Sequence, residues 1–558
     1  MSTLNLNQLR QAFPILQETA NGHPLVYFDN AATTQKPTLV IDAINQYYQQ
    51  HNANVHRASH FLSTQATEQF ELARSQVQHF INARHSHEII WTKGTTESIN
   101  LIAQSYGRSN LSPDDEILVS VMEHHANIVP WQIVAEQTGA TLKVIPVTQD
   151  NQLDLSAFET LLTHKTKVLA ICHASNSIGT INPVKEMIKR AKSVGATTLI
   201  DGAQAVAHFA IDVQDIDCDF YCFSGHKMFG PTGIGVLYGK SEYLNNMPPW
   251  QAGGEMIERV SFDGTTFNRL PFKFEAGTPN ISGAIGLGAA IRFIQSLDSD
   301  ARVQHEDNLR AIAIKRACAI PNLELVRQVQ PTVSLLSFNI SGYHASDIGM
   351  LLDKQGIAVR TGHHCTMPLM QHLGLDGTLR MSFSFYNTEA EVHHGFDCLE
   401  KILAAEKTTG NDSTPVPVST LPDINALTES LLAARGWESR YRMIMQLGKQ
   451  LPAYPEHLRS EQHIVPGCDS TVWLSHTQSN SASETITLEF SIDSNARIIK
   501  GLSVILLSYY NGRQPEDILS SNVETLFDTL GLSKHLSPSR NNGLHAINQR
   551  ILAIAQNP

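Results

Sequence analysis

The sequence predicts a large α/β domain with a mainly parallel sheet, followed by a separate, small α+β domain. The first observation is that, up to about residue 240, short apolar runs alternate with segments of helical length. Helices that alternate with strands are typical of a parallel sheet covered by helices. The runs lie at residues 88–91, 117–121, 142–147, 168–171, 197–200 and 220–223. The second observation is the length of 558 residues, which is too great for one hydrophobic core.

The third observation is a change of composition near residue 405. Residues 406–420 contain prolines and hydroxyl side chains without any periodicity, which is typical of a flexible linker. We therefore expect one domain at 1–405 and another at 421–558. In the second, helical patterns cover residues 424–451, 496–510, 523–530 and 543–555, and strand-like runs cover 471–475 and 485–492.

The composition argues against several classes of protein. A net charge of -12 provides no basic surface for nucleic acid or an anionic membrane. No apolar run approaches the roughly 20 residues of a membrane span, and the first residues lack the pattern of a signal peptide. Seven cysteines, an odd number scattered along the chain, indicate reduced thiols. We therefore expect a cytoplasmic protein.

Candidate ligand-binding residues follow the apolar runs, because ligands of parallel sheets bind beyond the carboxyl ends of the strands. Thr95 and Thr96 begin a helical pattern after the first run, where a glycine, hydroxyls and free backbone N–H groups suit a phosphate. An ordinary helix cap would have the same residues. His124 follows the second run and suits stacking on an aromatic cofactor or proton transfer, although a hydrogen-bonded core histidine is the alternative.

Two charged residues follow later runs. Asp201 ends an apolar run, and a buried aspartate needs a cationic partner or a metal. A protonated pyridine nitrogen is such a partner, and its charge makes the ring an electron sink. Lys227 follows the last run; an amine of low local polarity loses its proton and can form a Schiff base. A lysine leaving a strand for water is the alternative, but the ordered set of candidates favours a pyridoxal-phosphate site.

The chain resembles the class V aminotransferases and is closely similar to SufS-type cysteine desulfurases over about residues 5–405. The similarity lies in motifs at residues 28–33, 54–57, 94–97, 123–127, 175–176, 201–204, 224–227, 274–279 and 360–365. It implies fold type I of the pyridoxal-phosphate enzymes, with a large domain and a small C-terminal subdomain. Where this family more often has Ala-Gln after the cysteine of the last motif, this chain has Thr366-Met367.

The resemblance also implies a role for each residue around pyridoxal 5'-phosphate. Lys227 would bind the cofactor covalently, Asp201 would pair with the pyridine nitrogen, and Gln204 would bond the ring hydroxyl. His124 would stack on the ring and move protons, with Asn176 beside it. The residues implied to hold the phosphate are Thr95, Thr96, Ser224 and His226, joined by Thr278 from the second subunit of a homodimer.

A possible nucleophile follows in Gly362-His-His-Cys365. Metal binding is disfavoured, because three adjacent residues do not easily converge on one ion and no further ligands follow at suitable spacing. A structural loop cysteine remains an alternative. The resemblance makes Cys365 the nucleophile and Arg380 the bidentate partner of the carboxylate of L-cysteine. It places Asn30 beside Arg380 and Arg360 near the thiol.

The implied reaction converts L-cysteine to L-alanine and leaves a persulfide on Cys365. A selenocysteine lyase acting at the same site is the alternative. Another class V reaction such as transamination is disfavoured, because it needs neither Cys365 nor an acceptor thiol.

The second domain resembles the SufE family of sulfur acceptors over about residues 421–555. The similarity lies in motifs at residues 437–441, 447–448, 467–473, 499–502 and 536–544. It makes Cys468 the thiol that takes sulfur from Cys365, within or between subunits, for delivery to iron–sulfur assembly scaffold proteins. An iron–sulfur scaffold is the alternative for this domain, but a cluster usually needs about four ligands, and the domain has one cysteine.

Overall fold

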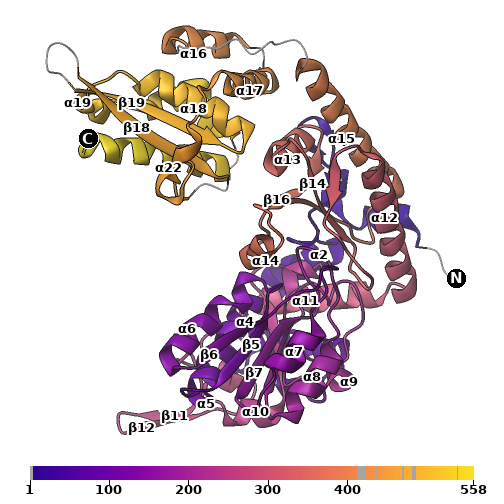
Figure 1. Cartoon of the computed structure of the whole chain (residues 1–558). Coiled ribbons are helices and arrows are strands. Elements are labelled where there is room, and N and C mark those ends of the chain that lie inside the picture. Colours follow the sequence, from indigo (N-terminus) through magenta and orange to yellow (C-terminus); the bar gives the residue numbers. More distant parts are fainter. Residues whose placement is uncertain (1–3, 411–420, 435, 468–469, 481–485, 537) are drawn as a thin grey trace. The chain divides into compact units, whose positions relative to one another are not determined.

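The computed structural model of the chain describes residues 4–410, 421–434, 436–467, 470–480, 486–536 and 538–558. It divides into two compact units, which are described separately: 1–339 with 355–398, and 340–354 with 399–558 (Figure 1). Helix α15 (Glu389–Gly410) continues past residue 406, where the composition predicts the start of the linker. Among the described helices, none combines the length and apolar content needed to cross a membrane.

A seven-stranded sheet forms the centre of the first unit. Its order is β4-β10-β9-β8-β7-β5-β6, and only β10 runs antiparallel to its neighbours. All residues of β4, β5, β8, β9 and β10 are buried, which explains why these strands are continuous apolar runs instead of alternating ones. The strands are β4 (Ile89–Thr92), β5 (Glu116–Ser120), β6 (Thr141–Ile145), β7 (Thr166–Cys172), β8 (Thr197–Asp201), β9 (Phe220–Ser224) and β10 (Gly235–Gly239).

Helices cover this sheet (Figure 1). In α8 (Val184–Ser193) the buried residues Val184, Met187, Ile188 and Ala191 recur at helical spacing, so one face packs on the core. Helix α11 (Ile281–Gln295) is buried along most of its length and packs against α2 and α3. The remaining helices of this part are α1 (Leu6–Gln11), α2 (Thr38–Gln46), α3 (Phe61–Phe80), α4 (Thr95–Ile102), α5 (Arg108–Asn110), α6 (Val129–Thr138), α7 (Leu155–Leu161), α9 (Val213–Ile216) and α10 (Ser241–Asn246).

A smaller four-stranded sheet, in the order β13-β14-β17-β16, lies C-terminal to the main sheet in the sequence. The pairing of the edge strand β16 with β17 sets Arg360 directly opposite Arg380. Strand β3 (Val26–Tyr27) pairs with β15 (Ile357–Ala358), and a bridge between Asp29 and Ser382 joins the chain start to β17. The sheet consists of β13 (Leu323–Leu325), β14 (Leu335–Ile340), β16 (Arg360–Gly362) and β17 (Thr378–Ser382), accompanied by α12 (Ser299–Ala319) and α14 (Met367–His372).

Short elements complete the first unit. A hairpin of β11 (Ile257–Ser261) and β12 (Gly264–Phe267) is almost fully exposed, and β1 (Thr19–Ala20) pairs with β2 (His23–Pro24).

The second unit contains α13 (Ala345–Asp353) and an α+β fold with its own apolar core. Strands β18 (Val472–Asn480) and β19 (Ile486–Ser494) form an antiparallel hairpin that packs against α18 (Arg497–Tyr510). Helix α18 closely approaches α17 at Gly501, where a Cβ would lie 1.8 Å from the carbonyl oxygen of Ile444. The other helices are α16 (Ile424–Ala433), α17 (Gly436–Leu447), α19 (Pro515–Ser520), α20 (Val523–Leu530), α21 (Leu532–His535) and α22 (Pro538–Gln556).

Candidate active site

A cavity of about 300 Å³ opens where β7, β8 and β9 end, and it brings together most of the predicted site residues. The predicted residues that line it are Thr95, Thr96, His124, Asn176, Asp201, Gln204, Ser224, His226, Lys227, Arg360, Cys365 and Arg380. The cavity lining does not include Asn30 or Thr278, whereas Cys468 lies outside the described residues.

One end of the cavity is rich in uncharged hydrogen-bonding groups. The backbone N–H of Thr95 donates to Ser224 Oγ at 2.8 Å, and the two hydroxyl oxygens lie 2.8 Å apart. Gly94, just before α4, packs closely against Gly235 at the start of β10. This approach is possible because Gly235 lacks a side chain; a Cβ there would lie 2.4 Å from the Cα of Gly94. Burial and the nearby charges of Lys227 and Lys36 lower the pKa of His226 to about 4, so its ring is neutral at pH 7. Hydroxyls at the positive end of a helix suit a phosphate group.

Asp201 places a buried carboxylate on the cavity wall. Its Oδ1 accepts a hydrogen bond from the Ala203 amide at 2.9 Å. Burial raises the pKa of this carboxyl, although the amide and the charge of Lys227 act in the opposite direction. A cationic ring nitrogen would stabilise the charged form in this place. Gln204 is held nearby by its Nε2, which donates to the carbonyl of Ala31 at 2.7 Å.

Lys227 ends a short turn, Gly225–Lys227, that follows β9 directly. Burial lowers the pKa of its amine; the negative charge of Asp201 opposes this shift, and the positive charge of Arg380 adds to it. A larger fraction of neutral amine makes the lysine more nucleophilic.

His124 lies on the same cavity as a neutral imidazole. Burial, followed by the charges of Lys227, His125 and Arg380, lowers its pKa to about 4. Its Nδ1 accepts a hydrogen bond from the Ala126 amide at 3.0 Å, so the proton of the neutral ring lies on Nε2. The ring can therefore donate a hydrogen bond through Nε2 at neutral pH.

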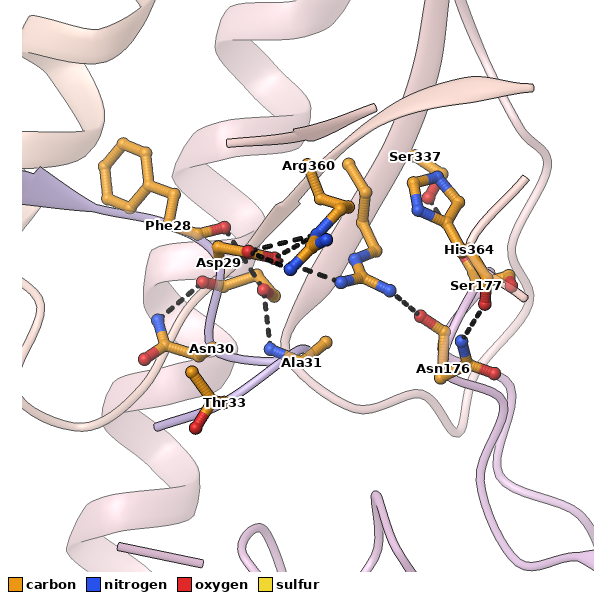
Figure 2. Close-up of polar contacts among 12 residues, drawn as sticks. Phe28, Asp29, Asn30, Ala31, Thr33, Asn176, Ser177, Ser337, Arg360 and His364 are labelled. Atoms are coloured by element: carbon orange, nitrogen blue, oxygen red, sulfur yellow. Dashed lines mark hydrogen bonds and ion pairs between the residues drawn. The ribbon is translucent and has the colours of Figure 1, made fainter. Parts of the chain in front are cut away.

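Two arginines and one carboxylate form the charged end of the cavity. Arg380 is buried, donates from Nη1 to the carbonyl of Asn176 at 2.7 Å, and pairs through Nη2 with Asp29 Oδ1 at 3.2 Å. Arg360 pairs with the other oxygen of Asp29, at 2.8 Å from Nη2 (Figure 2). The Nε of Arg380 is buried without a hydrogen-bond partner among the described residues. One carboxylate thus serves two guanidinium groups, which leaves positive charge for an anionic ligand.

The structure does not bring Asn30 to Arg380. The side-chain nitrogen of Asn30 donates to the carbonyl of Ser382 at 2.7 Å and to Asn387 Oδ1 at 3.1 Å, and its oxygen accepts from the Tyr386 hydroxyl. Of these two adjacent residues it is Asp29 whose side chain pairs with Arg380, and the sequence left Asp29 without a predicted role. The signal was present in the Phe28-Asp29-Asn30 motif, but the motif alone does not say which of two adjacent polar residues faces the cavity.

Cys365 is exposed and lies on a loop that enters the cavity after β16. Both His364 and Cys365 have left-handed backbone conformations, with φ of 53° and 58°. The amide of Cys365 donates to Nδ1 of His363 at 3.0 Å. Within the part of the chain that the structure describes, no group of three His, Cys, Asp or Glu residues is arranged to hold a metal ion.

These residues fit pyridoxal phosphate. The hydroxyl-rich start of α4 suits its phosphate, the buried carboxylate of Asp201 suits a protonated ring nitrogen, and the amine of Lys227 suits its aldehyde.

Comparisons with known proteins agree with this interpretation. Residues 26–394 match the class-V aminotransferase family, and residues 425–555 match the SufE family, described as an Fe-S metabolism associated domain. A probable cysteine desulfurase of Vibrio cholerae is 54% identical over 402 residues, which are 72% of this chain and 98% of that protein. A cysteine desulfurase of Shigella flexneri is 49% identical over 401 residues, with the same coverage of both chains. The crystal structure of an Escherichia coli cysteine desulfurase is 42% identical, with a TM-score of 0.68, over 72% of this chain and 100% of that one.

Proposed function

The chain belongs to the class-V aminotransferase family and carries a SufE-type domain after it, and on this premise we propose that it is a cysteine desulfurase that uses pyridoxal phosphate. It converts L-cysteine to L-alanine and passes the sulfur to a SufE-type domain, within one subunit or between the two. One observation carries the proposal: the amine of Lys227, the guanidinium of Arg380 and the thiol-bearing Cys365 open into the same cavity.

The chain's own residues supply cofactor binding and substrate orientation. Lys227 holds the cofactor covalently, Asp201 and Gln204 bind its ring, and Thr95, Thr96, Ser224 and His226 bind its phosphate. Once bound, the cofactor withdraws electrons from the bonds around the substrate Cα. Arg380 binds the substrate carboxylate, with Asn176 and Asp29 fixing the plane of its guanidinium at 2.7 and 3.2 Å.

Proton transfer and sulfur transfer then fall to three side chains. The amine of Lys227, freed when the substrate amine takes its place, has a lowered pKa and accepts the proton from the substrate Cα. Cys365 attacks the substrate sulfur as a thiolate; the S–S bond forms while the C–S bond breaks, and the carbon fragment keeps the electron pair. The proton of the substrate thiol passes to the carbon that carried the sulfur, and the neutral ring of His124 guides this transfer as a hydrogen-bond donor through Nε2. The protonated amine of Lys227 returns its proton to Cα, so that L-alanine leaves and an ionised persulfide remains on Cys365.

The persulfide sulfur then moves to Cys468, by attack of the Cys468 thiolate on the outer sulfur. The match of residues 425–555 to the SufE family supports this step. Ser470, which follows residues 468–469, is buried, and its hydroxyl accepts a hydrogen bond from Arg540 Nη1 at 3.1 Å. Scaffold proteins of iron–sulfur assembly in the cytoplasm are the proposed receivers of this sulfur.

A homodimer completes the proposed site. Thr278 does not line the cavity of its own chain but lies in a separate pocket with Trp91, Trp250 and Pro279. This placement supports a role for Thr278 in binding the phosphate in the other subunit.

The test compares the intact chain with Cys365→Ser and Cys468→Ser, each supplied with L-cysteine with and without a reductant. Alanine and protein-bound sulfane sulfur are measured. Cys365→Ser is expected to form no alanine, and Cys468→Ser to stop near one turnover unless a reductant is present. Cys318→Ser is the matched control, because Cys318 is also exposed but does not line the cavity. Alanine release by Cys365→Ser at the intact rate would disprove the mechanism, and multiple turnovers by Cys468→Ser without reductant would disprove the relay.

A further inference from the structure

The loop at residues 363–367, here called the thiol loop, has a backbone conformation that needs external support. His364 and Cys365 occupy the left-handed region consecutively, which side chains with a Cβ disfavour. A loop of this kind keeps its shape only when its surroundings fix it.

The inner side of the thiol loop is fixed by polar contacts to neighbouring segments. Asn176 Nδ2 donates to the carbonyl of His364 at 2.7 Å (Figure 2). The hydroxyls of Ser177 and Thr366 lie 2.6 Å apart, and Nε2 of His364 lies 2.8 Å from Thr378 Oγ1. The loop is therefore anchored on both sides of Cys365, at residues 364 and 366.

A second set of contacts to the loop comes from His125. Its backbone N–H donates to the carbonyl of Cys365 at 2.8 Å. Its ring Nε2 accepts the backbone N–H of Met367 at 3.0 Å. His125 thus contacts the cysteine itself and the residue at which α14 begins.

The ring contact depends on protonation. Because Nε2 accepts a hydrogen bond, the neutral ring carries its proton on Nδ1, and a second proton on Nε2 would remove the contact with Met367. Burial, followed by the charge of His363, lowers the pKa of His125, which favours the neutral form. The titratable rings that lie against His125 are His363, with ring centroids 5.5 Å apart, and His124, at 6.2 Å. Cys365, also titratable, contacts His125 through its backbone carbonyl.

We propose that His125 is a positioning residue: its neutral ring latches the thiol loop so that the sulfur of Cys365 faces the substrate. The proposal rests on the proposed function, because the latch serves catalysis only if Cys365 is the nucleophile. Above the pKa of His125 the latch is closed. As the pH falls through that pKa, the Met367 contact is lost and the loop is released.

The test uses the full chain loaded with cofactor, as wild type, His125→Leu and His125→Gln. Leucine fills the space without an acceptor, whereas glutamine offers an oxygen that does not titrate. His372→Leu, an exposed histidine at the end of α14, is the control. Hydrogen–deuterium exchange of peptides covering 363–368 is measured against pH, corrected for intrinsic exchange. The single-turnover rate of alanine formation and the KM for L-cysteine are measured in parallel.

His125→Leu is expected to raise exchange in the thiol loop about fivefold and to lower the single-turnover rate about tenfold, with KM changed less than about twofold. His125→Gln is expected to restore the rate to within about threefold. Loop exchange should rise on acidification in the wild type but stay flat in His125→Gln.

Unchanged loop exchange in His125→Leu would overturn the latch, even if alanine formation slowed. If His125→Leu fails to retain cofactor, His125→Gln decides. A rise of its loop exchange on acidification equal to that of the wild type would also overturn the latch. A wild type that forms no alanine would refute the proposed function, and the exchange data would still decide on the latch.

Discussion

Asp29 binds the buried Arg380 at 3.2 Å through Oδ1 while its other oxygen pairs with Arg360. The two arginines face each other across the β16–β17 pairing, so a single carboxylate orients both. Of the two, Arg380 is almost fully buried, and its orientation depends on few partners.

Removal of the Asp29 carboxylate is expected to weaken substrate binding. In Asp29→Ala, Arg380 loses one of its two fixed contacts, and we expect KM for L-cysteine to rise about tenfold, equivalent to about 1.4 kcal/mol, with a smaller change in kcat. Asp29→Asn keeps one acceptor oxygen, so its KM should lie between those of the wild type and Asp29→Ala. Steady-state kinetics at saturating cofactor measure this, and an unchanged KM in Asp29→Ala would contradict the role.

The lysine that holds the cofactor can be identified chemically. Borohydride treatment of the loaded wild type should fix the cofactor on the peptide that contains Lys227, as detected by mass spectrometry. Lys227→Arg should give no labelled peptide and no alanine, because guanidinium stays protonated and is not nucleophilic. Lys36, whose pKa burial lowers to about 8, provides the internal control: label on Lys36 in place of Lys227 would refute the assignment.

Asp201 is expected to destabilise the protein when the cofactor is absent. Burial raises the pKa of this carboxyl, so the folded state prefers the protonated form, and stability is lost as the pH rises through that pKa. Asp201→Asn should therefore raise the Tm of the cofactor-free protein at pH 7.5, by about 2–4 °C for each kcal/mol gained. The difference should vanish in acid, where Asp201 is protonated.

With cofactor bound, the wild type should have the higher Tm of the two proteins, because asparagine cannot neutralise a ring cation. Alanine formation by Asp201→Asn should fall at least about 100-fold. Thermal unfolding of both forms across pH, followed by activity of the loaded form, checks both parts. A cofactor-free wild type that is more stable than Asp201→Asn at pH 7.5 would contradict the argument.

The second unit should depend on Gly501. A Cβ at this position would meet the carbonyl of Ile444 at 1.8 Å, so α17 and α18 would have to separate. Gly501→Ala is expected to cost about 3 kcal/mol or more through overpacking. Thr525→Ala, at an exposed position of α20, is the control. Calorimetry should show a lower transition for the second domain only, and two unchanged transitions would contradict the close approach.

The parallel sheet was predictable because its strands are buried on both faces, which makes each one a short, continuous apolar run. All six runs between residues 88 and 223 correspond to strands β4 to β9. The same pattern carries no information on direction, so the antiparallel insertion of β10 between β4 and β9 could not be anticipated. In place of the one helix predicted at 424–451, the structure has two: α16 ends at Ala433, and α17 begins at Gly436.

The cavity lining was predictable where residues lie at or directly after the ends of neighbouring strands: Asp201 ends β8, and Lys227 lies in the turn after β9. The candidate site was not predictable where the side chains of two adjacent residues point to different partners. Asp29 and Asn30 differ in role because the bridge between Asp29 and Ser382 turns one side chain to the arginines and the other to Tyr386. The contacts of His125 were equally hidden, since they join segments about 240 residues apart.

The Nε of Arg380, which has no hydrogen-bond partner among the residues that the structure describes, also bears on which thiols the cavity admits. Cysteamine has the same amine and sulfur as L-cysteine but no carboxylate. If cysteamine occupied the cavity, Arg380 would lose contact with water without gaining a new counter-ion. This desolvation would weaken the binding of cysteamine. On the proposed function, the cavity is therefore expected to bind an amino acid in preference to its decarboxylated amine.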